Sequence, residues 1–273
     1  MPSTEMLVML AALVGAGVFA GLLAGLLGVG GGLIVVPVIY QVLKITDSDP
    51  MIHMHVAVGS SLALIVPTAL RSARAHYHHG AVDAALLRRW TPAMVAGVLS
   101  GVVLASMATS PVLSLVFACV ALAMAVWLGL APQRARLCEA PPDTAWVQAV
   151  PYAVGGLSSL MGIGGGSLSV PAMTVLGFPV HRAVGTSAAF GLVIAIPGAL
   201  GYAIAGWQHA GLPPGSLGYV NALAVACLLP TTLLTVPLGV RLAHHLSARM
   251  LRRVFAIFLA LVGLRMLWAA LGA

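Results

Sequence analysis

Long apolar runs separated by short polar segments dominate the chain. A bilayer core of about 30 Å needs about 20 apolar residues in each spanning helix, and runs of this kind recur along the whole sequence. They cover roughly residues 5–43, 54–75, 90–109, 111–131, 146–178, 183–206, 217–240 and 250–271. The first and fifth runs are too long for a single span, and glycines interrupt both. The pattern predicts an all-α polytopic membrane protein with two broken helices.

The two interrupted runs are related to each other. The first contains Gly28-Val-Gly30-Gly31-Gly32 followed by Pro37, and the fifth contains Gly162-Ile-Gly164-Gly165-Gly166 followed by Pro171. These five positions coincide at a constant spacing of 134 residues. A second block, His55-Val-Ala-Val-Gly59-Ser60-Ser61, matches His181-Arg-Ala-Val-Gly185-Thr186-Ser187 at a spacing of 126 residues. Blocks that recur in the same order indicate an internal duplication.

The duplication divides the chain into two homologous halves. A third pair of positions, Leu113 and Phe117 against Leu251 and Phe255, lies near the end of each half. We therefore expect residues 1–131 to form the first half, 132–145 a proline- and arginine-containing linker, and 146–273 the second half. Both halves should belong to one integrated transmembrane domain.

Composition strengthens the membrane prediction. Hydrophobic residues make up 60% of the chain and charged residues only 7%, whereas a soluble domain carries about a quarter charged residues. None of the six acidic residues lies in the interior of an apolar run. The basic balance does not indicate a nucleic-acid partner, because the arginines occur in short clusters between apolar runs.

The arginine clusters favour one topology over another. If all eight runs crossed the membrane, Lys and Arg would divide seven against six between its two sides. If each glycine-broken run instead returned to its own side as a re-entrant hairpin, each half would cross three times and the halves would be inverted. One side would then hold eleven arginines, leaving Lys44 and Arg265 on the other. This asymmetry fits the positive-inside rule. It predicts an inverted repeat in a bacterial inner membrane, with both termini periplasmic.

The glycine clusters are the first candidate site. Non-helical backbone at membrane depth persists only where protein or a watery cavity surrounds it. The helices that restart after each cluster present free N–H groups and a positive dipole end, which suit an anion. Broken segments at corresponding places in two halves indicate the binding site of a transporter. The candidate substrate-binding residues are Gly28, Gly30, Gly31, Gly32, Gly162, Gly164, Gly165, Gly166 and Ser167. Close helix packing is the alternative role for these glycines.

The second repeated block adds hydroxyls and histidines. Ser60, Ser61, Thr186 and Ser187 can donate hydrogen bonds to an anion, or they can cap helices and bond to nearby carbonyls. His55 and His181 can bind or relay protons, or they can lie at the membrane interface without a transport role. All six are candidate substrate-binding residues.

Other chemistry is not supported by the sequence. Neither glycine cluster is followed by the Gly-Lys-Ser/Thr of a P-loop, and neither has the strand and acidic residue of a dinucleotide site. The densest histidine cluster, His76-Tyr-His78-His79, lies beside Arg71 and Arg74 without carboxylate or cysteine ligands. We expect neither a metal site nor a cofactor. Because no acid lies within an apolar run, proton coupling would require histidine or a protonated substrate.

The paired G-x-G-G-G-x-x-x-x-P motif and the A-V-G-[ST]-S block resemble the sulfite exporter TauE/SafE family, also described as the toluene-sulfonate uptake permease group. The likeness covers residues 8–271. It implies a secondary transporter for sulfite or an organosulfonate, working by alternating access around a midplane site. A nickel- or cobalt-type metal permease is an alternative. An intramembrane hydrolase using Ser187 is another, although duplication of that serine favours a transport pathway. Neither the oligomeric state nor the direction of transport is predicted.

Overall fold

A computed structural model describes residues 14–15, 17–22, 32–44, 49–130, 145–244 and 248–271. Residues 17–22 are helical. The helices that follow are α2 (Gly32–Leu43), α3 (His53–His78), α4 (Ala84–Met107), α5 (Ser110–Leu130), α6 (Ala149–Met161), α7 (Gly165–Val175), α8 (Val180–Ala205), α9 (Ala222–His244) and α10 (Ala248–Ala270). Short 3-10 turns cover Pro50–Ile52 and Ala145–Gln148, and β1 (Ser216–Leu217) pairs antiparallel with β2 (Val220–Asn221).

Six of these helices are long and apolar enough to cross a membrane, namely α3, α4, α5, α8, α9 and α10. The remaining helices α2, α6 and α7 have 12, 13 and 11 residues, too short to span a bilayer core alone at 1.5 Å per residue. The predicted all-α polytopic membrane fold is thereby confirmed. The fifth apolar run is divided into α6 and α7, so the break predicted from its glycines lies at 162–164.

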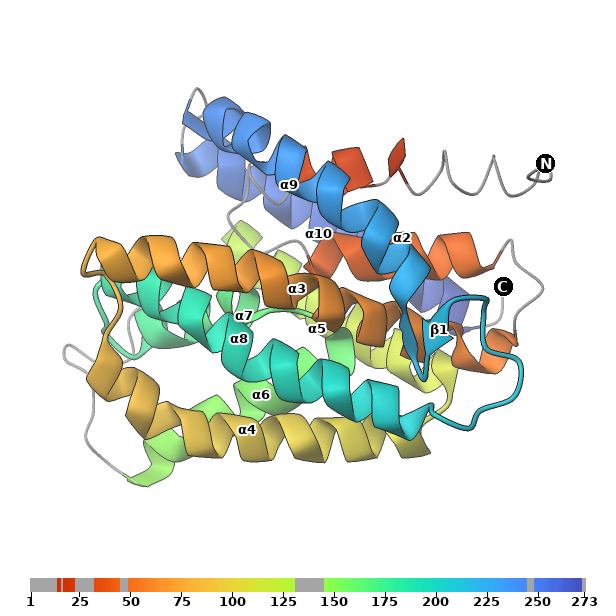
Figure 1. Ribbon diagram of the computed structural model, residues 1–273. Coiled ribbons are helices and arrows are strands. Elements are labelled where there is room, and N and C mark those ends of the chain that lie inside the picture. Colours follow the sequence, from red (N-terminus) through yellow and green to blue (C-terminus); the bar gives the residue numbers. More distant parts are fainter. Residues whose placement is uncertain are drawn as a thin grey trace.

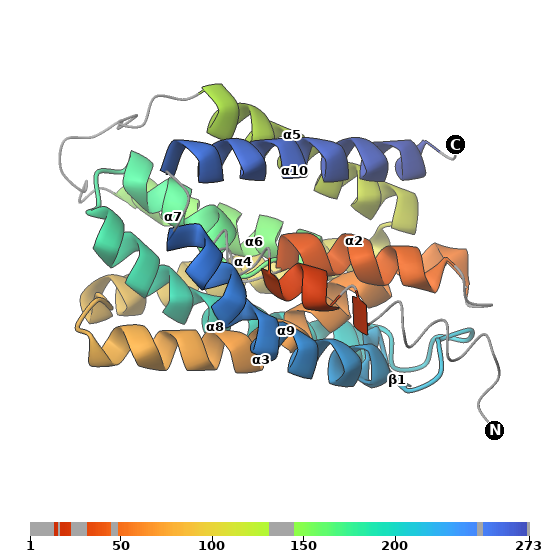
Figure 2. The same cartoon turned by 90° about the horizontal axis from the view of Figure 1, so that it is seen from above.

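Elements at equivalent positions in the two sequence halves pack against each other (Figures 1 and 2). The long helix α3 lies against α8, and α5 lies against α10. Within the halves, α2 packs on α3 and α7 packs on α8. The short helix α6 instead packs on α4, which belongs to the other half of the sequence. The core therefore draws helices from both halves.

Glycines allow close helix approach at two seams. On α4, an added Cβ at Gly97 or Gly101 would overlap the backbone of α6 at Tyr152 or Gly156. At the other seam, Gly17 and Gly21 lie directly against threonine side chains of α9. Helices in lipid gain no hydrophobic free energy by associating, so small residues stabilise their association by permitting close van der Waals packing. Gly17 and Gly21, which precede the first GxGGG cluster, therefore have a packing role.

The two ends of the helix bundle differ. At one end, the turn between α3 and α4 meets the start of α8, where Asp83 N–H donates to Thr186 Oγ1 at 3.0 Å. We call this the arginine-rich end, because Arg71, Arg74, Arg88, Arg89 and Arg182 belong to these segments. At the opposite end, the start of α3 meets the start of α5, with Met54 N–H donating to Ser110 Oγ at 3.0 Å. The β1–β2 hairpin also lies here, and we call it the β-hairpin end.

Candidate functional site

The break between α6 and α7 is built from glycine backbone. Gly162 ends α6 with φ +68°, a left-handed conformation in which a Cβ would be strained. The N–H of Ile163 closes this turn by donating to Ser158 O at 3.0 Å. Gly164 is extended (φ −79°, ψ 171°), and α7 begins at Gly165. Residues 162–165 are all buried, so an unwound backbone lies inside the protein.

The first half of the chain encloses this break. Ser61 Oγ on α3 donates to Gly162 O at 2.7 Å. Gly32, the first residue of α2, packs so closely that a Cβ there would lie 2.7 Å from Gly162 O. A Cβ added at Gly164 would lie 3.3 Å from Ile65 Cγ2 on α3. The two glycine clusters, separated by 134 residues in sequence, therefore meet in the structure at Gly32.

The start of α7 is pressed against α8. A Cβ added at Gly165 would lie 2.6 Å from both Ser187 O and Gly191 N, which are backbone atoms. Ser187 Oγ donates to Val184 O of its own helix at 2.8 Å. Two serines in the first turns of α7, Ser167 and Ser169, are buried. The first turn of α7 is thus enclosed by protein on its α8 side.

These contacts separate the predicted site residues into groups. Gly32, Ser61, Gly162, Gly164, Gly165 and Ser187 lie together around the break. Gly166 and Ser167 follow in the first turn of α7. Gly28, Gly30 and Gly31 lie outside the described residues. Ile65 and Gly191 also belong to this enclosure; they carry no polar side chain, and sequence reasoning did not select them.

Ser60 and Thr186 instead hold the starts of two helices. Ser60 Oγ accepts from Asn221 N–H at 2.8 Å, while Thr186 Oγ1 accepts from Asp83 N–H. Asn221 and Asp83 are themselves capping residues: Asn221 Oδ1 accepts from Ala224 N–H of α9, and Asp83 Oδ1 accepts from two N–H groups of α4. Each hydroxyl therefore fixes a helix start in the other half of the sequence. The hydroxyls do not cap these helices themselves; they hold the backbone of the residues that do.

The neighbouring glycines complete the same two contacts. Gly59 packs against the carbonyl of Tyr219, two residues before Asn221. Gly185 packs against the carbonyl of Ala81, two residues before Asp83. The repeated A-V-G-[ST]-S block thus forms a matched pair of contacts at opposite ends of the bundle. The sequence revealed that the block is repeated, but not which loop it meets.

The two equivalent histidines have different surroundings. His55 is buried at the β-hairpin end, where its Nε2 lies 2.9 Å from Ala105 O and 3.1 Å from Ala108 O. Its ring lies 5.0 Å from that of Tyr219. His181 is exposed at the arginine-rich end. The structure therefore does not bring the pair together.

Burial raises the pKa of Tyr219, and the Asp49 carboxylate raises it further, so its hydroxyl is protonated at neutral pH.

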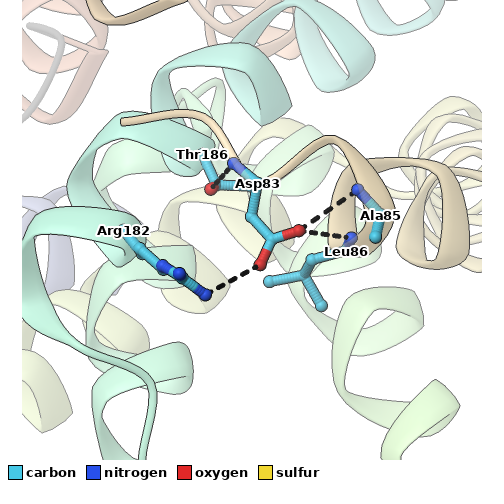
Figure 3. A network of polar contacts seen from close by, with 5 residues as sticks. All are labelled: Asp83, Ala85, Leu86, Arg182 and Thr186. Atoms are coloured by element: carbon cyan, nitrogen blue, oxygen red, sulfur yellow. Dashed lines mark hydrogen bonds and ion pairs between the residues drawn. The ribbon is translucent and has the colours of Figure 1, made fainter. Parts of the chain in front are cut away.

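A charged network lies at the arginine-rich end (Figure 3). Asp83 Oδ2 lies 3.8 Å from Arg182 Nη1, and Asp83 Oδ1 accepts hydrogen bonds from Ala85 and Leu86 N–H at 3.1 and 3.0 Å. With the Thr186 contact, this network joins the start of α4 to the first turns of α8. The sequence did not indicate that Asp83 and Arg182 lie together.

In the described part of the chain, no group of three His, Cys, Asp or Glu residues is placed to hold an ion. The larger cavity, about 720 Å³ between α5 and the α6–α7 segment, has an almost wholly apolar lining that includes Cys119, Trp127 and Pro171. An anion placed there would lose its hydration without compensation. This groove is therefore unsuited to an anionic substrate.

Comparison with known proteins places these features in a family. The family described as Sulfite exporter TauE/SafE matches residues 13–266, almost the whole chain. The chain belongs to this family. It is also 31% identical over 264 residues to a "probable membrane transporter protein" of Haemophilus influenzae, a match that covers 95% of this chain and 97% of the relative.

More distant TauE/SafE-type relatives match over a similar extent. Another probable membrane transporter protein, from Bacillus subtilis, is 26% identical, with 94% of this chain and 96% of the relative covered. One from Methanocaldococcus jannaschii is 24% identical, with 96% and 97% covered. No solved structure matches the chain. The protein is a multi-pass membrane transporter rather than an enzyme.

Proposed function

We propose that this TauE/SafE protein is a secondary carrier for a small oxyanion, sulfite or an organosulfonate, and that the anion binds beside the break between α6 and α7. The observation that carries the proposal is the buried backbone of residues 162–165, from which α7 restarts with its N–H groups and positive dipole end. The family description names sulfite export. Both lines indicate a small anion.

We further propose that α6 and α7 form a re-entrant hairpin. Gly97 of α4 packs on Tyr152 and Gly101 packs on Gly156, so α6 runs beside α4 in the same direction, away from the arginine-rich end. The start of α7 lies beside Ser187, and α7 ends at Val175, shortly before α8 begins at that same end. The chain thus enters and leaves from one side, which supports the hairpin.

The first half supports the same arrangement in the opposite direction. Gly17 and Gly21 pack on Thr231 and Thr235, so residues 17–22 run beside α9, away from the β-hairpin end. The following helix α2 returns: it begins beside Gly162, and its Tyr40 reaches the ring of His53 at the start of α3. Two hairpins that enter from opposite sides are what an inverted repeat requires.

This arrangement also supports a topology. In bacterial inner membranes, short cytoplasmic loops carry the excess of Lys and Arg. We therefore propose that the arginine-rich end faces the cytoplasm and that both termini are periplasmic. Alternating access would then expose the hairpin tips first to one side and then to the other. In the described part of the chain the only acids, Asp49 and Asp83, lie outside the helices, so none of the described helices supplies a carboxylate for proton coupling.

The test is counterflow in proteoliposomes. Purified protein is reconstituted with unlabelled sulfite inside, and uptake of labelled sulfite, sulfate, sulfoacetate and acetate is measured against protein-free liposomes. We expect exchange of sulfite or sulfoacetate, with acetate much slower. If none of the oxyanions exchanges while the protein is correctly inserted, the carrier function is refuted. Nickel and cobalt uptake measured in the same vesicles tests the alternative metal permease.

A further inference from the structure

A second polar feature lies away from the helix break, at the arginine-rich end. A cavity of about 230 Å³ is lined by residues 80–84, in the turn between α3 and α4, and by Arg182 at the start of α8. Its lining is mainly polar, in contrast to the apolar groove beside α5. A cavity of this character and size suits a small hydrated anion.

We propose that this cavity is an outer binding site for the anionic substrate, where Arg182 binds the anion before or after the anion occupies the helix break. The inference rests on the proposed function. A guanidinium group presents five N–H donors in a planar fork that matches an oxyanion. Arg182 is the cation that lines the cavity, and its side chain is 67% exposed. The group is therefore open to a ligand from the aqueous side.

The existing partner of Arg182 is weakly held. The distance from Arg182 Nη1 to Asp83 Oδ2 is 3.8 Å, longer than a charge-assisted hydrogen bond of 2.7–2.9 Å. Exposed ion pairs of this kind contribute little to stability. The other oxygen, Asp83 Oδ1, is engaged by the first turn of α4. An anion can therefore take the place of Asp83 Oδ2 at Arg182 while the α4 cap stays intact.

The surrounding charge favours anions over cations. Arg71, Arg74 and Arg88 are exposed on the neighbouring ends of α3 and α4. In the described part of the chain, Asp83 is the acid at this end, since Asp49 lies at the β-hairpin end beside Gly211. A mouth lined by one sign of charge raises the local concentration of the opposite ion.

The cavity also lies close to the helix break along α8. Arg182 lies one helical turn before Thr186 on α8, and the same helix contacts Gly165 at residues 187–191. At 1.5 Å per residue, the outer site lies about 10 Å along the helix axis from the start of α7. An anion leaving Arg182 would thus need to travel only a short distance to the proposed inner site.

The matching position at the other end lacks this chemistry. In the repeated block, the residue equivalent to Arg182 is Val56, which is fully buried. The capping residue equivalent to Asp83 is the neutral Asn221, whose Nδ2 donates to Pro214 O and Ser216 Oγ. The outer site therefore exists on one face only, and its removal should affect transport from one side of the membrane.

The test compares Arg182→Gln, Asp83→Asn and Arg74→Gln in membrane vesicles of both orientations, with labelled sulfite. Arg182→Gln should raise the half-saturating sulfite concentration roughly threefold or more when sulfite is supplied to the arginine-rich face. Supply to the opposite face should show no change. Asp83→Asn keeps a capping side chain but removes the competitor for Arg182, so it should lower that concentration. Arg74→Gln removes an exposed charge at the same end but outside the cavity; it changes only the local field, so its effect on that concentration should be clearly smaller.

If Arg182→Gln raises the half-saturating sulfite concentration and Asp83→Asn lowers it, Arg182 binds the anion. A purely structural ion pair would be weakened by both substitutions, and both would then shift that concentration in the same direction. Equal shifts in the same direction, or an equal effect of Arg74→Gln, would overturn the outer site. Stabilisation of the detergent-solubilised protein by sulfite at constant ionic strength gives a readout without transport. Stabilisation of the wild-type protein but not of Arg182→Gln would support the outer site by itself. Failure of anion exchange in the proteoliposomes would refute the proposed carrier function without affecting that result.

Discussion

The closest backbone approach at the helix break gives a quantitative prediction, which concerns Gly165. A Cβ added there would lie 2.6 Å from Ser187 O and Gly191 N, whereas ordinary van der Waals contact begins near 3.4 Å. Helix α7 would have to move from α8 by about 0.8 Å, and neither contacting atom belongs to a flexible side chain. Overpacking of this kind costs about 1–3 kcal/mol.

Gly165→Ala also improves helix propensity by about 1 kcal/mol, which offsets part of that cost. The expected net loss is therefore up to about 2 kcal/mol, or a fall in Tm of up to about 8 °C for a domain of this size. Anion exchange should fall as well, because the displaced segment is the proposed binding backbone. The matched control is Gly156→Ala in α6, where the added Cβ would lie 3.4 Å from Gly97 O, an ordinary contact.

Thermal unfolding in detergent measures the first effect, and sulfite counterflow in proteoliposomes measures the second. Size-exclusion chromatography shows whether each variant is folded and monodisperse. We expect Gly156→Ala to match or exceed the stability of the wild-type protein and to exchange normally. If Gly165→Ala proved as stable and as active as Gly156→Ala, the close contact between α7 and α8 would not constrain the site, and the reasoning would be refuted.

Three further predictions follow from the contacts at the break and at the two ends. Ser61→Ala removes the 2.7 Å hydrogen bond to Gly162 O at the break. It should lower the free energy of unfolding by about 1–3 kcal/mol, because it leaves a buried carbonyl unpaired. The Ser187 hydroxyl bonds within its own helix, so Ser187→Ala should cost clearly less in the same unfolding assay. Asp83→Ala should lower stability by about 1 kcal/mol through loss of the α4 cap, and equal stability of the two proteins would contradict that role. Cysteines engineered at Ser72 and at Leu217, both exposed, should react with impermeant reagents from opposite sides of the membrane, and labelling from one side would contradict the topology.

Much of the fold follows from patterns within the sequence. Each of the six candidate spanning helices overlaps one of the predicted apolar runs, because the length of such a run is set by bilayer thickness rather than by partners in the fold. The break at Gly162–Gly164 was also predictable, since clustered glycines leave the backbone free to adopt the left-handed turn seen at Gly162. These are local properties of the chain.

The roles of the repeated hydroxyls were not predictable. Ser60, Ser61, Thr186 and Ser187 are polar residues in apolar runs, and any of them could have faced a substrate. In the structure, Ser61 donates to the break, Ser187 bonds to its own helix, and the other two hold capping residues. Which acceptor a hydroxyl meets depends on how helices cross, and sequence spacing carries no information on that.

By itself, the sequence determined that the protein spans a membrane and that the run containing Gly162–Gly166 is broken at its glycines. The tertiary structure decided that the first GxGGG cluster meets the second at Gly32, while the candidate histidines lie apart. It also placed Asp83 beside Arg182, residues about 100 positions apart in the chain. The physical reason is range: hydropathy and backbone freedom act within a few residues, whereas a binding site is formed by contacts that only helix packing can create.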